Sequence, residues 1–295
     1  MRNFAIISDS CCDLELALRE KYGVEYVPMH YIIDEKDYLA DLDWHEISAH
    51  EFYDIIRGGK RILTAQVTAA QYTEAFESHL KAGEDILSIS CSSALSASVK
   101  ASYAVRDELL KKYPEAKIVC IDSLNSCYGL GQLCILASEL RAEGKSIEEI
   151  AAFIEEHKLE MNQECTVGKL TYLKQAGRVS AASAFFGGLL NIKPIIISDA
   201  VGNNHAVEKV KGRAASISRI AERVKDQIRD FPYQKLYFAH ADAPEAAEEL
   251  KSAVLEAIPE VKCEVHMGYI GPIVGASAGP GTIAVYFFGK KVDLV

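Results

Sequence analysis

Small hydroxyl side chains follow three predicted strands of the N-terminal half, where they could bind an anion. Ser10, the segment 92–98 and Ser123 each come directly after an apolar run that predicts a strand. Ligands of open α/β sheets collect at the carboxyl ends of strands. The segment 92–98 and the residues after Ser123 also open predicted helices, whose free N–H groups favour a carboxylate or phosphate. Ordinary N-capping by Ser and Asp is the better explanation of any one such loop, but three such loops in one domain leave both interpretations open.

Strand and helix signals alternate along the first half of the chain, which predicts a parallel sheet covered by helices on both faces. The predicted strands are 4–8, 24–28, 85–91 and 117–122, and the predicted helices are 13–21, 48–56, 69–82, 94–112, 128–143 and 147–159. Residues 32–44 are acidic and are predicted to be irregular.

The second half predicts a mixed sheet with helices, because strand signals follow one another near its end. The predicted strands are 166–170, 194–198, 208–211, 236–240, 264–267 and 282–288, and the predicted helices are 170–175, 181–190, 217–228 and 245–257. The fold class is therefore α/β, with an N-terminal domain over 1–160 and a C-terminal domain over 161–295.

The acidic composition excludes several classes of partner. Acidic residues outnumber basic ones by 42 to 32 in a chain of 295, and the net charge is -10. The chain has no basic stripe of the kind that binds nucleic acid.

The eight cysteines form no C-x-x-C pair and are expected to be free thiols in a reducing compartment. No secretory signal is visible, and the uncharged stretch 267–289 is too rich in Gly and Pro for a membrane helix. We expect a cytoplasmic protein without stable membrane insertion.

Three recognisable chemistries are not supported by their motifs. The chain has no G-x-x-x-x-G-K-[ST], and Gly129-Leu130-Gly131 lacks the third glycine of a dinucleotide site. Gly275–Gly279 satisfies G-x-S-x-G, but no histidine follows it and a strand comes next where a nucleophile elbow needs a helix. The histidines are scattered and the acidic group at 34–43 lacks a calcium-loop pattern, so no metal is expected.

Seven segments, taken together and in this order, resemble motifs of the DegV family of bacterial fatty-acid-binding proteins, and the resemblance runs from end to end of the chain. The similar segments are Ile6–Leu14, Thr64–Thr68, Ser92–Ser98, Asp122-Ser123 with Gly129–Gly131, Leu173–Ser180, Leu190–Pro194 and Gly279–Gly281. The resemblance implies two α/β domains that enclose a long-chain fatty acid of the palmitate, stearate or oleate type, with no other cofactor. It also implies a non-enzymatic protein that presents this lipid to a fatty acid kinase, which would carry ATP and form the acyl phosphate.

The resemblance assigns roles to particular residues. Thr64 and Ser96 are implied to hydrogen-bond the fatty acid carboxylate. The residues implied to lie near the ligand are Ser10, Ser93, Ala65, Ser277 and Gly279. Ser277 stands where the family often has a histidine, and a hydroxyl can donate a hydrogen bond but carries no charge. Arg178 and Lys211 are implied to dock the kinase, although Lys211 replaces an arginine and loses its fork of donors.

Two alternatives remain beside a fatty-acid carrier. An enzyme could act on an acyl or phosphorylated substrate at the serine-rich helix starts, although no motif pairs a nucleophile with a base. A lipid-sensing regulator would share every feature of the carrier. The apolar run Phe185–Leu190 could line the lipid tail or pack in the core, since periodicity does not separate these roles.

Overall fold

The computed structural model describes residues 3–180 and 191–295, which form two compact units. The first unit contains the chain up to Asp43 and Leu63–Lys158, and the second contains Trp44–Ile62 and Leu159–Val295. The predicted boundary at 160 lies close to the division after Lys158, but a single boundary does not describe 44–62, which folds with the second unit. The predicted helix 181–190 and the candidate lining Phe185–Leu190 lie outside the described residues.

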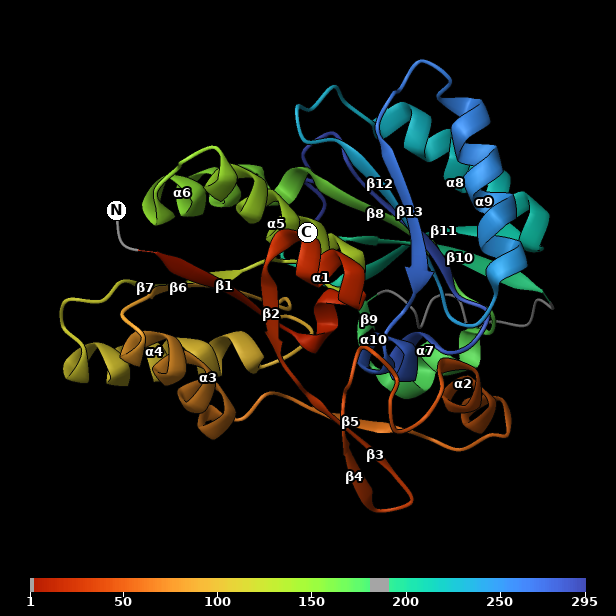
Figure 1. The fold of residues 1–295 in the computed structure, drawn as a ribbon. Helices are drawn as coiled ribbons and strands as arrows, with labels where there is room; N and C mark the ends of the chain where they lie inside the picture. The colour runs from red at the N-terminus through yellow and green to blue at the C-terminus, as the bar shows by residue number, and fades with distance from the viewer. Residues whose placement is uncertain (1–2, 181–190) are drawn as a thin grey trace. The chain divides into compact units, whose positions relative to one another are not determined.

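A four-stranded parallel sheet is the centre of the first unit, with strand order β2-β1-β6-β7 (Figure 1). Its strands are β1 (Phe4–Asp9), β2 (Val24–Val27), β6 (Asp85–Ser90) and β7 (Ile118–Asp122). Every residue of β1 and β6 is buried, as expected for central strands covered on both faces.

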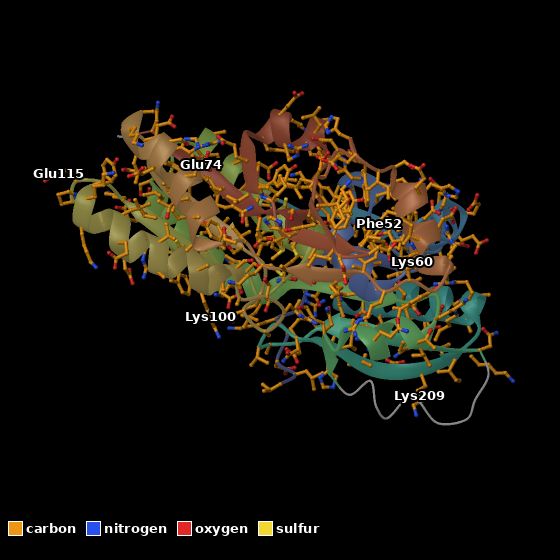
Figure 2. The ribbon with its side chains drawn as sticks, turned by 90° about the horizontal axis from the view of Figure 1, so that it is seen from below. Phe52, Lys60, Glu74, Lys100, Glu115 and Lys209 are labelled. Atoms are coloured by element: carbon orange, nitrogen blue, oxygen red, sulfur yellow. The ribbon has the colours of Figure 1, made fainter. Side chains whose placement is uncertain are left out.

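Helices cover both faces of this sheet, which confirms the predicted fold class of the first unit. The helices are η1 (Ser10–Cys12), α1 (Leu16–Tyr22), α3 (Ala69–Lys81), α4 (Ser98–Lys112), α5 (Cys127–Ala142) and α6 (Ile147–His157). Helices α3 and α4 pack on one face, and α5 and α6 pack on the other (Figure 1). Charged side chains such as Glu74 on α3 and Lys100 on α4 are exposed (Figure 2).

The prediction that residues 32–44 are irregular is wrong, because part of this segment forms a hairpin. Strands β3 (His30–Ile33) and β4 (Lys36–Leu39) pair antiparallel, and β5 (Leu63–Ala65) adds to the other edge of β3. Asp34 and Glu35 form the two-residue turn with φ of 50° and 66°. Two positive φ values are typical of a type I′ hairpin, which usually shows itself by Asn-Gly or Asp-Gly. The turn residues Asp34 and Glu35 lack this signal, so the sequence did not indicate the hairpin.

The second unit is built on a seven-stranded mixed sheet with the order β13-β12-β14-β8-β10-β11-β9. Its strands are β8 (Met161–Thr166), β9 (Val179–Ser180), β10 (Ile192–Ser198), β11 (Asn204–Lys211), β12 (Lys235–His240), β13 (Glu264–Tyr269) and β14 (Ile283–Phe288). Strands β12 and β13 are parallel, whereas β12 and β14 are antiparallel. The predicted mixed sheet is confirmed.

The helices of the second unit include one from the N-terminal half of the sequence. They are α2 (Ala49–Arg57), α7 (Leu170–Ala176), α8 (Arg213–Gln227), α9 (Pro244–Ala257) and α10 (Pro272–Ala278), with the 3-10 turn η2 (Lys158–Glu160) at the junction of the units. The core between α8, α9 and the sheet includes Ile220, Leu250, Ile195 and Val285. No helix of the described residues is long and apolar enough to cross a membrane.

The strand predicted at 166–170 is wrong. The strand is β8, which ends at Thr166, and Leu170 begins α7. The start of β8 lacks the apolar pattern of a buried strand because it contains the polar residues Asn162, Gln163 and Glu164, although every residue of the strand is buried. Glu164 tolerates burial because Arg223 on α8 donates to its carboxylate at 2.7 Å.

Candidate functional site

The carboxyl ends of β1 and β6 form a topological switch point in the first unit. From β1 the chain continues to β2 on one side, while β6 and β7 lie on the other side. Loops at such a point leave space between them, which is why ligands of open parallel sheets bind there. The predicted hydroxyl loops, which contain Ser10 and the segment 92–98, follow these two strands.

Asp9, at the end of β1, links the two loops through its carboxylate. Its carboxylate accepts the backbone N–H of Cys11 at 2.9 Å and that of Cys91 at 2.8 Å. Burial raises the pKa of Asp9 to about 6, and the two backbone hydrogen bonds oppose that rise. Asp9 is therefore a hydrogen-bond acceptor that fixes both loops. From the sequence alone, this role could not be distinguished from ordinary N-capping of one helix.

Ser10 and Ser93 lie in these loops and have positioning contacts of their own. The hydroxyl oxygen of buried Ser10 accepts the N–H of Met29 at 2.9 Å. The backbone N–H of Ser93 donates to both carboxylate oxygens of Asp122 at 3.2 and 3.3 Å, at the end of β7. Asp122 also accepts the N–H of Leu124 at 3.1 Å. Two strand-end aspartates, Asp9 and Asp122, thus hold the hydroxyl loops in place.

Thr64 lies in the middle of β5, a strand of the small antiparallel sheet. It is paired directly with Tyr31 of β3, so the two side chains share one face. Tyr31 in turn stacks on Tyr38 with ring centroids 5.1 Å apart. Thr64 is half-buried, and its neighbour Ala65 is exposed. The Thr64 hydroxyl therefore lies on the tyrosine face of the sheet.

A chain of hydrogen bonds connects the segment of Thr64 with the loop of Ser96. The Ser96 hydroxyl lies 3.0 Å from the Ser98 hydroxyl and accepts the Ser98 N–H at 3.2 Å. The Ser98 oxygen accepts the N–H of Val67, which follows β5, at 3.1 Å. Ser96 is half-buried like Thr64, whereas Ser98 is fully buried. The structure thus joins the two segments that carry the predicted carboxylate ligands, through a residue, Ser98, that the sequence did not single out.

Ser277 and Gly279 lie in and after α10 of the second unit. Ser277 is half-buried within the helix, so G-x-S-x-G does not form a strand-to-helix nucleophile elbow here. Gly279 has a φ of 74°, and a Cβ at this position would lie 2.2 Å from the Tyr172 ring. The second glycine of the motif is therefore required by a left-handed turn and close packing.

Arg178 and Lys211 are both exposed on the second unit. Arg178 precedes β9 and donates to the carbonyl of Ala176 at 2.8 Å, and Lys211 is the last residue of β11. Strands β9 and β11 are paired parallel. Both cations are accessible to a partner, and their role in docking stays a prediction.

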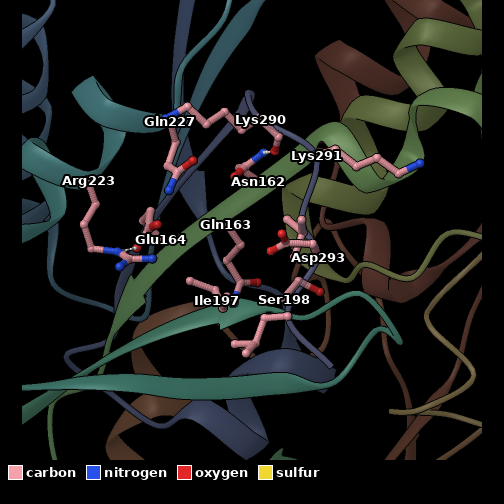
Figure 3. Close-up of a pocket in the computed structure, with 12 residues that line it drawn as sticks. Asn162, Gln163, Glu164, Ile197, Ser198, Arg223, Gln227, Lys290, Lys291 and Asp293 are labelled. Atoms are coloured by element: carbon pink, nitrogen blue, oxygen red, sulfur yellow. Dashed lines mark hydrogen bonds and ion pairs between the residues drawn. The ribbon is translucent and has the colours of Figure 1, made fainter.

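A cavity of about 100 Å³ lies in the second unit beside the C-terminal segment (Figure 3). Its lining is largely polar and charged and includes Asn162, Gln163, Glu164, Arg223 and Asp293. Pockets for drug-sized ligands typically enclose about 300–1,000 Å³ and are mostly apolar. The cavity is therefore too small and too polar for an acyl chain, and Arg223 already neutralises Glu164.

The structure thus shows a two-unit α/β protein whose first unit carries hydroxyl loops at the switch point of a parallel sheet. A model of the DegV family of uncharacterised proteins matches residues 3–290. The chain belongs to the DegV family.

Similarity to members of this family extends over the whole chain. It is 36% identical to a DegV domain-containing protein of Clostridium perfringens over 99% of this chain and 100% of that protein. A fatty-acid-binding DegV family protein of Thermus thermophilus has 25% identity and a TM-score of 0.87, covering 98% of this chain and 100% of that one. A stearic-acid-binding protein of Eubacterium ventriosum has the same fold, with 22% identity, a TM-score of 0.86 and coverage of 98% and 99%.

Proposed function

We propose that this protein binds a long-chain fatty acid and holds its carboxylate with the hydroxyls of Thr64 and Ser96. The hydrogen-bonded connection Ser96–Ser98–Val67 carries this proposal, because it brings two half-buried hydroxyl segments together at the strand ends of the first unit. Family membership supports it, since relatives from Thermus thermophilus and Eubacterium ventriosum bind fatty acid and stearic acid.

The energetics favour an apolar ligand with a neutral head-group site. Burying the roughly 14 methylenes of palmitate contributes about 11 kcal/mol before the costs of binding. The head group then needs hydrogen-bond partners more than an opposite charge. Hydroxyl and N–H donors suffice for this, because a hydrogen bond to a charged group contributes about 1.5–3 kcal/mol.

Solvent extraction followed by mass spectrometry tests the ligand directly. Freshly purified protein should release a long-chain fatty acid in near-stoichiometric amount, or should take up added stearate after delipidation. Protein that contains no such acid and takes none up would refute the proposal.

Substitution of the hydroxyls tests the head-group site. The Thr64→Val and Ser96→Ala variants should each weaken stearate binding by about ten-fold or more, because each removes a hydrogen bond to a charged group. Ser218→Ala, an exposed change on α8, is the matched control and should bind as the wild type does. Unchanged affinity in both site variants would contradict this assignment while leaving lipid binding possible at another site.

We also propose that the protein is not an enzyme by itself and presents its ligand to a fatty acid kinase. The helical position of Ser277 supports the first part, and the exposed cations Arg178 and Lys211 support the second. With such a kinase, Arg178→Ala and Lys211→Ala should lower acyl phosphate formation without changing lipid affinity. Ester hydrolysis or ATP turnover by the purified protein alone, lost in Ser96→Ala, would favour the enzyme alternative.

A further inference from the structure

Ser96 caps the start of helix α4 from just outside the helix. The N-cap position itself is Ala97, whose side chain accepts no hydrogen bond from the first turn. The hydroxyl oxygen of Ser96 accepts the N–H of Ser98 instead, at 3.2 Å. Serine side chains often bond a backbone group two residues further along the chain. The Ser96 hydroxyl is therefore fixed at a helix N-terminus, where the backbone favours negative charge.

The Ser98 hydroxyl, by contrast, is closed off from solvent and has few partners. Its oxygen accepts the N–H of Val67 at 3.1 Å and lies 3.0 Å from the Ser96 hydroxyl oxygen. Within residues 3–180 and 191–295, the Ser98 side chain makes no other hydrogen bond. Ser98 is fully buried, so bulk water does not reach its proton.

These partners decide which of the two hydroxyls donates to the other. A buried polar group without a partner is costly, so the Ser98 proton needs an acceptor. If Ser96 donated to Ser98, the Ser98 proton would have no acceptor in the described part of the chain. Ser98 therefore donates to Ser96. The N–H of Val67 favours the same direction, because a hydroxyl that accepts a hydrogen bond becomes a stronger donor.

The Ser96 hydroxyl is left with one free capability, which is to donate. Its oxygen accepts both the N–H and the O–H of Ser98, and a hydroxyl oxygen has two lone pairs. Ser96 is half-buried, and within the described ranges its hydroxyl has no hydrogen-bond partner besides Ser98. A head group at Ser96 must therefore offer an acceptor.

We propose that Ser98 is a specificity-determining residue of the head-group site: it obliges the Ser96 hydroxyl to donate, so that the site selects an ionised carboxylate over a neutral head group. This inference rests on the proposed function and adds to it a residue that does not touch the ligand. A carboxylate gains most, because hydrogen bonds to ionised acceptors are about twice as strong as neutral ones. Val67, Ser96 and Ser98 all lie in the first unit.

Binding of stearate and of stearyl alcohol to Ser98→Ala tests the inference. The variant should bind stearate about five-fold more weakly, which corresponds to the net contribution of roughly one hydrogen bond. Its affinity for stearyl alcohol should stay nearly unchanged, because a neutral head group gains little from a polarised donor. Ser98→Thr keeps the hydroxyl and should restore stearate affinity. A variant that merely distorted the site would weaken both ligands alike.

A double-mutant cycle with Ser96→Ala shows whether Ser98 acts through Ser96. In the Ser96→Ala background, Ser98→Ala should have little further effect on stearate affinity, because coupled residues are not additive. Ser102→Ala is the matched control, since it removes another buried hydroxyl of α4, one that donates to the carbonyl of Val99 at 2.8 Å. It should leave the affinities for both ligands unchanged.

The amide proton of Val67 gives a second test that needs no variant, and it serves if Ser98→Ala folds poorly. Stearate should move its NMR resonance in the wild type to lower field, and further than stearyl alcohol does. The reason is that charge at Ser96 strengthens each bond of the chain back to Val67. Equal shifts with the two ligands would contradict the inference.

Three results of the binding measurements would overturn the inference while leaving fatty acid binding intact. They are unchanged stearate affinity in Ser98→Ala, an equal loss for stearate and stearyl alcohol, and a loss that persists in full without the Ser96 hydroxyl. The inference also fails if Ser96→Ala alone binds stearate normally. Wild-type protein that binds no stearate would instead refute the proposed function itself.

Discussion

Asp9 shows at the residue scale how one buried carboxylate can fix two loops at the ends of different strands. It accepts backbone N–H groups from two loops that follow different strands. A neutral side chain of similar size cannot accept both bonds equally, because an amide has only one acceptor oxygen. The ionised carboxylate is therefore retained although burial opposes its charge.

The raised pKa of Asp9 predicts a dependence of stability on pH. The folded-state pKa is about 6 and the ordinary value is 3.8, so the folded protein binds this proton more tightly. The corresponding stability is fully present below pH 3.8 and is lost as pH rises to about 6, by roughly 3 kcal/mol.

Urea unfolding of the wild type and of Asp9→Asn between pH 4 and about pH 7 measures this contribution. The difference between their free energies of unfolding should change across this interval and level off above it. A constant difference at every pH would show that Asp9 does not titrate there. Because Asp9→Asn lacks this titration, its free energy of unfolding relative to that of the wild type should rise as pH rises from 4 to about 7.

Helix α5 shows at the element scale why a glycine pattern can mislead. The Gly129-Leu130-Gly131 sequence lies at its start, and a Cβ at Gly131 would lie 2.6 Å from the carbonyl oxygen of Cys12. The same Cβ would lie 2.7 Å from Leu14. The glycine therefore permits α5 to pack closely on η1, and no dinucleotide is needed to explain it.

Gly131→Ala should lower the free energy of unfolding by about 1–3 kcal/mol through overpacking. The thermal midpoint should fall accordingly, as measured by circular dichroism. Gly58→Ala is the control, since its added Cβ meets nothing closer than 3.4 Å and its backbone is helical. Equal stability of the two variants would contradict the close-packing explanation.

Periodicity correctly predicted the elements in which mainly apolar side chains are buried. Strands β1 and β6 and helices such as α9 show plain apolar patterns, and all were expected within a few residues. The failures have physical causes. Strand β8 buries Glu164, which Arg223 on α8 neutralises. No helix was predicted over 272–278, where α10 lies, because α10 contains weak helix formers such as Gly275 and Ser277.

At the scale of the whole molecule, ligand binding should stabilise the folded chain by mass action. Under the proposed function, stearate at about 100 times its dissociation constant should add about 2.7 kcal/mol, because a ligand that binds only the folded state shifts the unfolding equilibrium. For a protein of this size we expect the thermal midpoint to rise by roughly 5 °C. Differential scanning fluorimetry below the micelle concentration measures this shift.

The Thr64→Val, Ser96→Ala double variant should show a clearly smaller shift at the same stearate concentration. Stearyl alcohol, which lacks the carboxylate, is the matched ligand and should stabilise wild type and variant alike. An equal shift with stearate in both proteins would show that the tail is bound without help from these hydroxyls.

Sequence alone determined the α/β class, the hydroxyl loops at strand ends and the residues that resemble the family's carboxylate ligands. These features are local, because strand periodicity, loop composition and motif order are written in neighbouring residues. Tertiary structure alone decided that Asp9 ties two loops, that Ser98 joins Thr64's segment to Ser96's loop, and that residues 44–62 fold with the second unit. Each of these depends on partners distant in the sequence, and local patterns hold no information about which distant groups will meet.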